Sequence, residues 1–291
     1  MKAPATTHKL TAGGLRAPLA VIAVYLVAAA GVWLGWWGTD WSGIQASGRQ
    51  PPSPEHWLGT NLLGQDIFSR LLAGTATAFE VGLLVSVPAT LLGALVGAFA
   101  GYFPQRWPDA VLMWLTGTLD AIPFYLFVIA LSYAMRDHPA AMQLAMIMTF
   151  WTLTARIVRA ETLRIRQLGF VAAARVSGLG SWQIIRRHVV PHTVHILLVQ
   201  AAILFVAAIK AEVLLSFLGL GLQDGVSWGI MLAEASQEIL AGHYGNFVAA
   251  SAALLLLVLA INRMTDELQR SADPRSRGSA DPAARHEATR A

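Results

Sequence analysis

The chain has 291 residues, of which 55% are hydrophobic and 13% are charged, and its mean hydropathy is +0.53. Soluble domains carry about 25% charged residues, so the composition excludes an ordinary water-soluble domain and predicts a protein solvated mainly by lipid. The net charge of +4 is attributed to orienting loops rather than to nucleic-acid binding, and the absence of cysteine excludes disulfides and thiolate metal sites.

Six stretches are long and apolar enough to cross the membrane, since ~20 residues span the hydrocarbon as a helix. In chain order they are 17–38, 79–102, 111–135, 140–158, 193–219 and 245–263. Each is apolar around its whole circumference, as lipid-buried helices are. The first is too long for the core of a cleavable signal and is interpreted as a retained span. The predicted fold class is therefore an all-α membrane protein with six transmembrane helices.

The polar segments are assigned to the two sides of the membrane by their Lys and Arg content. Six spans place both termini on one side, and that side receives 17 of the 21 Lys and Arg residues. The positive-inside rule makes it the cytoplasmic side. It holds the N-terminus 1–16, an insert at 160–191 and the tail 264–291, whose Ser, Ala, Pro and Arg content predicts disorder. The opposite side holds the loop 39–78, in which residues 65–73 are predicted to form a short amphipathic interfacial helix.

The 160–191 insert interrupts the transmembrane core 79–263 with a basic, patterned stretch that includes five Arg. Its composition favours a helix over 160–176, a break at Gly178 and Gly180, and a second helix over 182–188 that stops before Pro191. From these residues alone, two interpretations of the insert are equally supported: a docking surface for another protein, and an ordinary cytoplasmic loop that is basic only because of the positive-inside rule.

Three motifs in order carry a resemblance to a known family. The motif in the insert consists of Ala172, Ala173, Ala174, Gly178 and Pro191, with Arg187-His188 before the Pro. This spacing resembles the cytoplasmic loop of ABC importer permeases, in which a Glu stands where this chain has Ala172. The outer loop motif is His56-Trp57-Leu58-Gly59-Thr60-Asn61 with Leu63-Gly64-Gln65-Asp66 and Ser69-Arg70. The third is Ala211-Glu212, Leu215-Ser216-Phe217-Leu218-Gly219-Leu220-Gly221 and Ser227-Trp228-Gly229.

Over about 55–275 the chain is similar to dipeptide, oligopeptide and nickel permeases, and to the second, C-type subunit of such systems. The resemblance implies a type I ABC importer bundle in the bacterial inner membrane. It implies four kinds of partner: membrane lipid, a homologous permease, two ATPase subunits and a periplasmic solute-binding protein. It also implies that the insert contacts an ATPase subunit through Ala172, Ala173, Ala174, Arg175, Gly178, Arg187, His188 and Pro191.

ATP hydrolysis is expected in the partner subunits, because the chain has no G-x-x-x-x-G-K-[ST] loop to hold a phosphate. The chain is therefore predicted not to be an enzyme and to hold no cofactor itself. The eight His show no metal-ligand spacing, so no metal site is expected. The cargo stays open among dipeptides, oligopeptides, nickel or metal chelates and sugars.

Three ionisable residues inside apolar stretches are candidates for the translocation path or the interface with the partner permease: Asp120, Lys210 and Glu212. The alternatives are that Lys210 snorkels and that Asp120 stabilises a helix break at Pro123. A secondary transporter or channel is the alternative function, and an intramembrane enzyme is a third, although no His lies well inside a span to activate a serine.

Overall fold

The computed structural model describes residues 12–221 and 224–272, and its regular elements there are all helical. In chain order they are α1 (Ala12–Trp33), α2 (Ile67–Tyr102), α3 (Trp107–Asp120), α4 (Phe124–Ala134), α5 (Ala141–Ile165), α6 (Gly169–Val176), α7 (Ser181–Ile184), the π-helical turn η1 (Ile185–Val189), α8 (Val190–Phe217), α9 (Trp228–Ile239) and α10 (Gly245–Ala272). The all-α fold class is confirmed.

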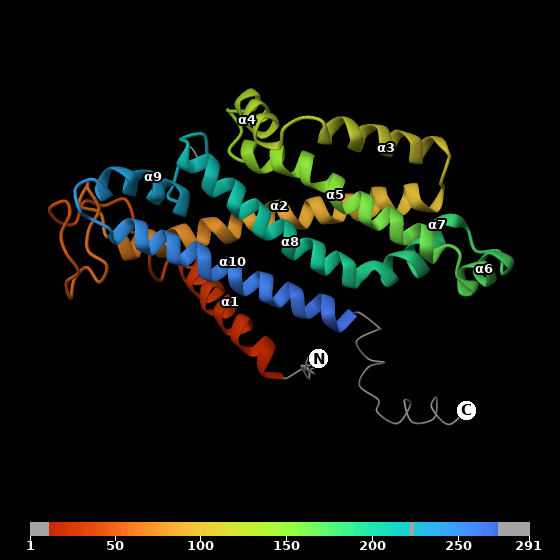
Figure 1. Cartoon of the computed structure of the whole chain (residues 1–291), viewed down its shortest axis with the longest axis horizontal. Helices are drawn as coiled ribbons and strands as arrows, with labels where there is room; N and C mark the ends of the chain where they lie inside the picture. Colours follow the sequence, from red (N-terminus) through yellow and green to blue (C-terminus); the bar gives the residue numbers. More distant parts are fainter. Residues whose placement is uncertain (1–11, 222–223, 273–291) are drawn as a thin grey trace, which may run out of the picture.

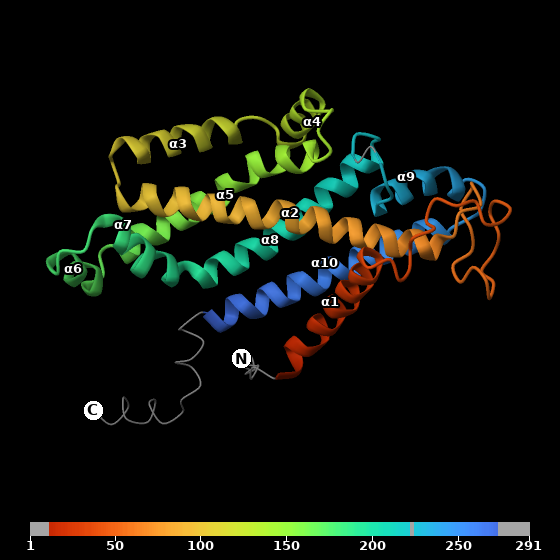
Figure 2. The same cartoon turned by 180° about the vertical axis from the view of Figure 1, so that it is seen from behind.

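The helices form an elongated bundle in which α2, α5, α8 and α10 follow the long axis (Figure 1). One end of the bundle carries α6 and α7, and the opposite end carries α9 together with the irregular loop between α1 and α2. Figure 2 shows the same arrangement from behind, with α3 and α4 on one side of the bundle and α1 on the other.

Five of the described helices are long and apolar enough to cross a membrane, and the pair α3–α4 makes a sixth crossing if it is counted as one span. That pair is bent by 93°, so the prediction of one continuous helix over 111–135 was wrong. The break coincides with Pro123, which lacks an N–H to donate and disfavours helical backbone at the preceding residue. Asp120 is the last residue of α3 and lies directly before this break.

Residues 65–73 do not form a separate interfacial helix, because α2 begins at Ile67 and continues without interruption to Tyr102. Asp66 caps this helix by accepting a hydrogen bond of 2.7 Å from the backbone N–H of Ser69. The predicted tail also begins later than expected, since α10 runs on to Ala272. The rest of the predicted disordered tail, 273–291, lies outside the described residues, as does most of the N-terminal segment.

Helices α2 and α5 pack unusually closely through a stripe of glycines spaced four residues apart. A Cβ added at Gly97 would lie 2.3 Å from the carbonyl oxygen of Ala155, and one at Gly101 would lie 2.6 Å from that of Arg159. At Gly93 the nearest atoms, also at 2.6 Å, belong to Thr154 and to the backbone of Trp151. Because small residues let two backbones meet in this way, the glycines fix how α5 lies on α2.

A second core joins α2, α8, α9 and α10. Trp228 at the start of α9 is fully buried and packs in one cluster with Phe79, Phe205 and Leu257. The helix α1 is attached to this core where the hydroxyl of Tyr25 donates to the backbone carbonyl of Ala253 at 3.0 Å. The end of the bundle that carries α9 is thus built from parts far apart in the sequence.

The substitution Gly97→Val is expected to lower stability by ~1–3 kcal/mol or more, because the new Cβ meets backbone rather than a flexible side chain. The thermal unfolding midpoint of the detergent-solubilised protein measures this. Gly117→Ala in α3 is the matched control, since nothing lies within 4 Å of its added Cβ. Equal midpoints for the two variants would contradict the close-packing interpretation.

Candidate functional site

The 160–191 insert is folded differently from its predicted form of two short helices. Residues 160–165 are the last turns of α5, the chain turns at 166–168, and α6 occupies Gly169–Val176. The second helix does not stop before Pro191, because α7 continues through η1 into α8. The π turn lies directly ahead of Pro191, where the missing proline N–H disturbs the regular α-helical pattern.

The inner face of the insert is anchored to the ends of α2 and α5. A buried cluster contains residues of α6 to η1 together with Ala98, Tyr102, Val158 and Ile165 of those two helices. The residues from α6, α7 and η1 are Val171, Ala174, Ile184, Ile185 and Val189. The guanidinium of Arg175 lies over the ring of Tyr102, 5.2 Å from its centroid, and its Nε donates to the tyrosine hydroxyl at 3.2 Å.

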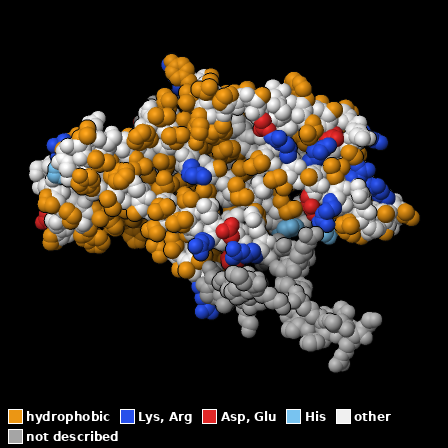
Figure 3. All heavy atoms as spheres, in the orientation of Figure 1, with side chains coloured by type: hydrophobic (Ala, Val, Ile, Leu, Met, Phe, Trp, Pro, Cys, Tyr) orange, Lys and Arg blue, Asp and Glu red, His pale blue; other side chains and the backbone are white. Residues whose placement is uncertain are grey.

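The outer face of the insert is exposed and partly apolar. Ala172 and Ala173 are exposed, and on the same short helix 90% of Val176 is accessible. Trp182 of α7 and Arg187 of η1 are exposed as well. Figure 3 shows this end of the molecule as a mixture of hydrophobic and basic side chains. The insert therefore offers a formed surface whose inner side is tied to two long helices.

The candidate residues of the insert divide between these two faces. Ala174 is buried in the anchoring cluster, whereas Pro191 is exposed at the start of α8. His188 is half-buried, with its ring 6.0 Å from that of Phe170, and the phenyl ring stacks at 4.9 Å on His192. The predicted set thus holds both anchoring and surface residues.

Gly178 is needed for its backbone conformation rather than for space. Its φ is +82°, in the left-handed region, and nothing lies within 4 Å of an added Cβ. Beside it, the N–H of Leu179 donates to the carbonyl of Ala174 at 3.2 Å, which closes the end of α6. A residue with a β-branched side chain here strains the turn between α6 and α7.

The three charged candidates inside the spans do not come together. Glu212 is only 1% exposed, and its carboxylate accepts hydrogen bonds from Ser216, at 2.5 Å, and from Ser227, which also caps α9. Lys210 is exposed on α8, and Asp120 is exposed at the end of α3. Glu212 therefore links α8 to the start of α9 in this chain.

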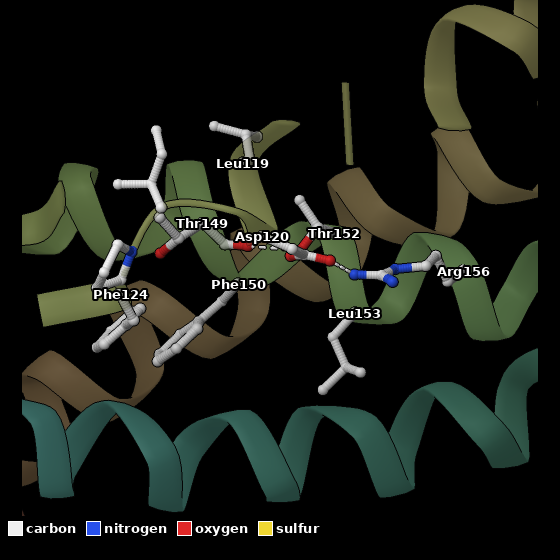
Figure 4. Close-up of a pocket in the computed structure, with 10 residues that line it drawn as sticks. Leu119, Asp120, Phe124, Thr149, Phe150, Thr152, Leu153 and Arg156 are labelled. Carbon is white, nitrogen blue, oxygen red and sulfur yellow. Dashed lines mark hydrogen bonds and ion pairs between the residues drawn. The ribbon is translucent and has the colours of Figure 1, made fainter. Parts of the chain in front are cut away.

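Asp120 instead meets a residue that the sequence did not pair with it. Its carboxylate forms an ion pair with Arg156 of α5 and accepts a hydrogen bond of 3.3 Å from the hydroxyl of Thr152 (Figure 4). The pair borders a cavity of about 440 Å³ at the break between α3 and α4. The lining residues are Leu119, Asp120, Ile122, Pro123, Phe124, Thr149, Phe150, Thr152, Leu153 and Arg156.

A buried polar cluster at the α9 end gives a structural role to the outer loop motif. Arg70, 3% exposed, donates to both carboxylate oxygens of Glu234 at 2.7 and 2.8 Å and also to Gln65. The amide of Asn61 donates to Gln65, and the carboxylate of Glu238 accepts the backbone N–H of Leu62 at 2.7 Å. These contacts hold the loop against α9. The sequence revealed the motif but not its acidic partners, which lie more than 160 residues further along.

Comparison with known proteins assigns the family. Residues 93–278 match the family model described as binding-protein-dependent transport system inner membrane component. The chain belongs to this family. The permease is 38% identical over 231 residues to the oligopeptide transport system permease protein OppC of Mycobacterium tuberculosis, covering 78% of this chain and 79% of that protein.

Two other relatives of the permease are similarly close. The dipeptide transport system permease protein DppC of Bacillus subtilis is 36% identical over 228 residues, covering 78% of this chain and 71% of that protein. The glutathione transport system permease protein GsiD of Pectobacterium atrosepticum is 36% identical over 229 residues, covering 78% and 75%. The resemblance to C-type permeases of peptide ABC transport systems is confirmed, and the family is one of multi-pass membrane permeases rather than enzymes.

In the permease, Arg70→Met is expected to cost about 3 kcal/mol, because it removes the buried cation that pairs with the carboxylate of Glu234 and donates to Gln65. The unfolding midpoint of the detergent-solubilised permease measures the loss, and adding Glu234→Met to Arg70→Met is expected to recover part of it. Arg136→Gln is the control, since that arginine is exposed and its side chain interacts, within the described residues, with Tyr133 of its own turn. An Arg70→Met variant as stable as the control would refute the role of the cluster.

Proposed function

We propose that the permease is one of two membrane subunits of an ATP-driven importer in the bacterial inner membrane. With a homologous permease it forms the path for a peptide or a related small solute that a periplasmic binding protein delivers. Two cytoplasmic ATPase subunits supply the energy, and the 160–191 insert receives their movement. ATP and Mg²⁺ bind to those subunits and not to this chain.

The construction of the insert is the observation that carries this proposal. A surface that transmits movement must be accessible on one side and firmly attached to the moving helices on the other. The exposed Ala172, Ala173 and Val176 meet the first condition. The buried cluster with α2 and α5, and the unbroken passage from α7 into α8, meet the second.

The proposed orientation follows from charge and from the two ends of the bundle. The end with α6 and α7 carries the basic insert, which the positive-inside rule places in the cytoplasm. The end with α9 lies opposite and carries the acidic Glu234 and Glu238. Both termini are then cytoplasmic. A secondary transporter or channel, the alternative that the sequence alone left open, would predict transport that is indifferent to ATP.

The variant Gly178→Val is expected to uncouple import from ATP hydrolysis, because a β-branched residue at φ +82° distorts the turn that shapes the insert. Peptide import and ATPase activity of the assembled transporter are measured together. Gly178→Asn is the matched control, since Asn tolerates the left-handed region and is expected to retain most of the coupling. Import by Gly178→Val at the wild-type rate, with the ATPase bound, would refute the docking role.

The orientation can be tested with single cysteines because the natural chain has none. Val176→Cys on the insert and Leu240→Cys after α9 are a matched pair, since each native side chain is 90% exposed. A membrane-impermeant thiol reagent is expected to label the L240C thiol in intact spheroplasts and the V176C thiol only after permeabilisation. The opposite pattern would invert the topology.

A further inference from the structure

The ion pair between Asp120 and Arg156 lies where α3 breaks, inside the membrane-spanning part of the permease. Asp120 is the last residue of α3, about 20 Å along that helix from its start at Trp107. A carboxylate there also faces the negative end of the helix dipole, so it requires a cation. Arg156, contributed by α5, supplies it.

Neither charge of this pair is buried. The side chain of Asp120 is 38% exposed and that of Arg156 is 44% exposed. Exposed charges at membrane depth cannot face lipid without a cost of several kcal/mol, so they face a partner protein or water. By contrast, Asp109 and Arg159, which pair between the same two helices, are much less exposed.

The cavity beside the pair has the composition of a binding site for a small amphipathic molecule. Its volume of about 440 Å³ lies within the range of small-molecule sites. Phe124 and Phe150 stack on each other with their ring centroids 4.8 Å apart, and Thr149 and Thr152 also line the cavity, with Thr152 beside Asp120 (Figure 4). The cavity therefore offers one anion, one cation, two hydroxyls and an apolar wall.

We propose that this cavity is a transient subsite for a short peptide with free termini, on the path through the membrane. The peptide ammonium binds the carboxylate of Asp120, the peptide carboxylate binds the guanidinium of Arg156, and an apolar side chain packs on Phe124 and Phe150. The inference rests on the proposed function, since it names where the transported solute contacts this subunit.

The exchange of partners explains why a zwitterion fits this site. A peptide with both termini charged replaces one ion pair by two, so no charge is left unpaired at membrane depth. A peptide blocked at both ends gives neither residue a partner and gains nothing by opening the pair. The peptide is expected to bind weakly, because a solute in transit has to leave the site again.

The test uses Thr149→Cys, a small change in the cavity lining of a chain without other cysteines. The whole transporter in nanodiscs is treated with a charged, water-soluble thiol reagent, and modification of this chain is followed by mass. Leu255→Cys, on an exposed apolar position of α10, is the control for a thiol that faces lipid. The T149C thiol is expected to react several-fold faster than the L255C thiol.

The probe is the dipeptide Ala-Phe, compared with the same dipeptide acetylated at its N-terminus and amidated at its C-terminus. Free Ala-Phe is expected to slow modification of the T149C thiol several-fold, and the blocked dipeptide is expected to leave the rate unchanged. In the combined variant Asp120→Asn, Arg156→Gln, which leaves no unpaired charge, the thiol is expected to remain reactive but to lose the protection.

Import of radiolabelled Ala-Phe by cells carrying T149C separates this inference from the proposed function. Import together with an unprotected thiol, or protection that survives Asp120→Asn, Arg156→Gln, would overturn the subsite. A T149C thiol as unreactive as L255C would overturn it as well, since the cavity would then be dry. Protection without import would support the subsite and count against the proposed transport function.

Discussion

The close contact between α2 and α5 is the constraint on which the functional parts of the permease depend. The glycine stripe at 93, 97 and 101 brings the two backbones together, so α5 has little freedom to slide or rotate on α2. Helix α5 carries Arg156 beside the cavity and ends at Ile165, within the cluster that anchors the insert. One rigidly placed helix thus joins both candidate sites.

This connection gives the proposed coupling a physical route. Arg156 and Ile165 are nine residues apart on one unbroken helix, a distance of about 14 Å. Under the proposed function, a displacement of the insert moves the end of α5, and a packed helix passes that displacement on rather than absorbing it. The break between α3 and α4 is the more compliant partner, since Pro123 removes a helical hydrogen bond there. A movement of α5 would therefore change the Asp120–Arg156 contact first.

Three carboxylates on the membrane-crossing helices of the permease are accommodated in different ways. Glu212 is fully buried and is satisfied by hydroxyls. Asp109 is also buried and meets Arg159 through two hydrogen bonds. The pair of Asp120 with Arg156 is half-exposed and opens onto a cavity. The first two arrangements tie helices together, whereas only the third leaves donors and acceptors accessible to a solute.

The crossings were predictable from the sequence because hydropathy and helix length are local properties. The helix break at Pro123 was predictable for the same reason, since it depends on the chemistry of a single residue. The sequence did not show where α2 begins, because the polar residues at its start suggest a separate helix lying at the membrane surface. In the structure Arg70 is instead buried against Glu234, 164 positions away. The partner of Asp120 was missed because Arg156 comes from another helix, and no spacing rule connects the two.

The departure from the family pattern at Ala172 has a limited structural consequence. The residue is exposed on α6 and takes no part in the cluster that anchors the insert, so a missing carboxylate costs the chain no internal contact. Its effect is confined to the surface offered to a partner. There Ala172 lies beside Ala173 on a helix that also exposes Val176, while Arg187 supplies charge from η1. In this permease the proposed docking surface therefore depends on close apolar contact and on arginine, rather than on a carboxylate at the head of the motif.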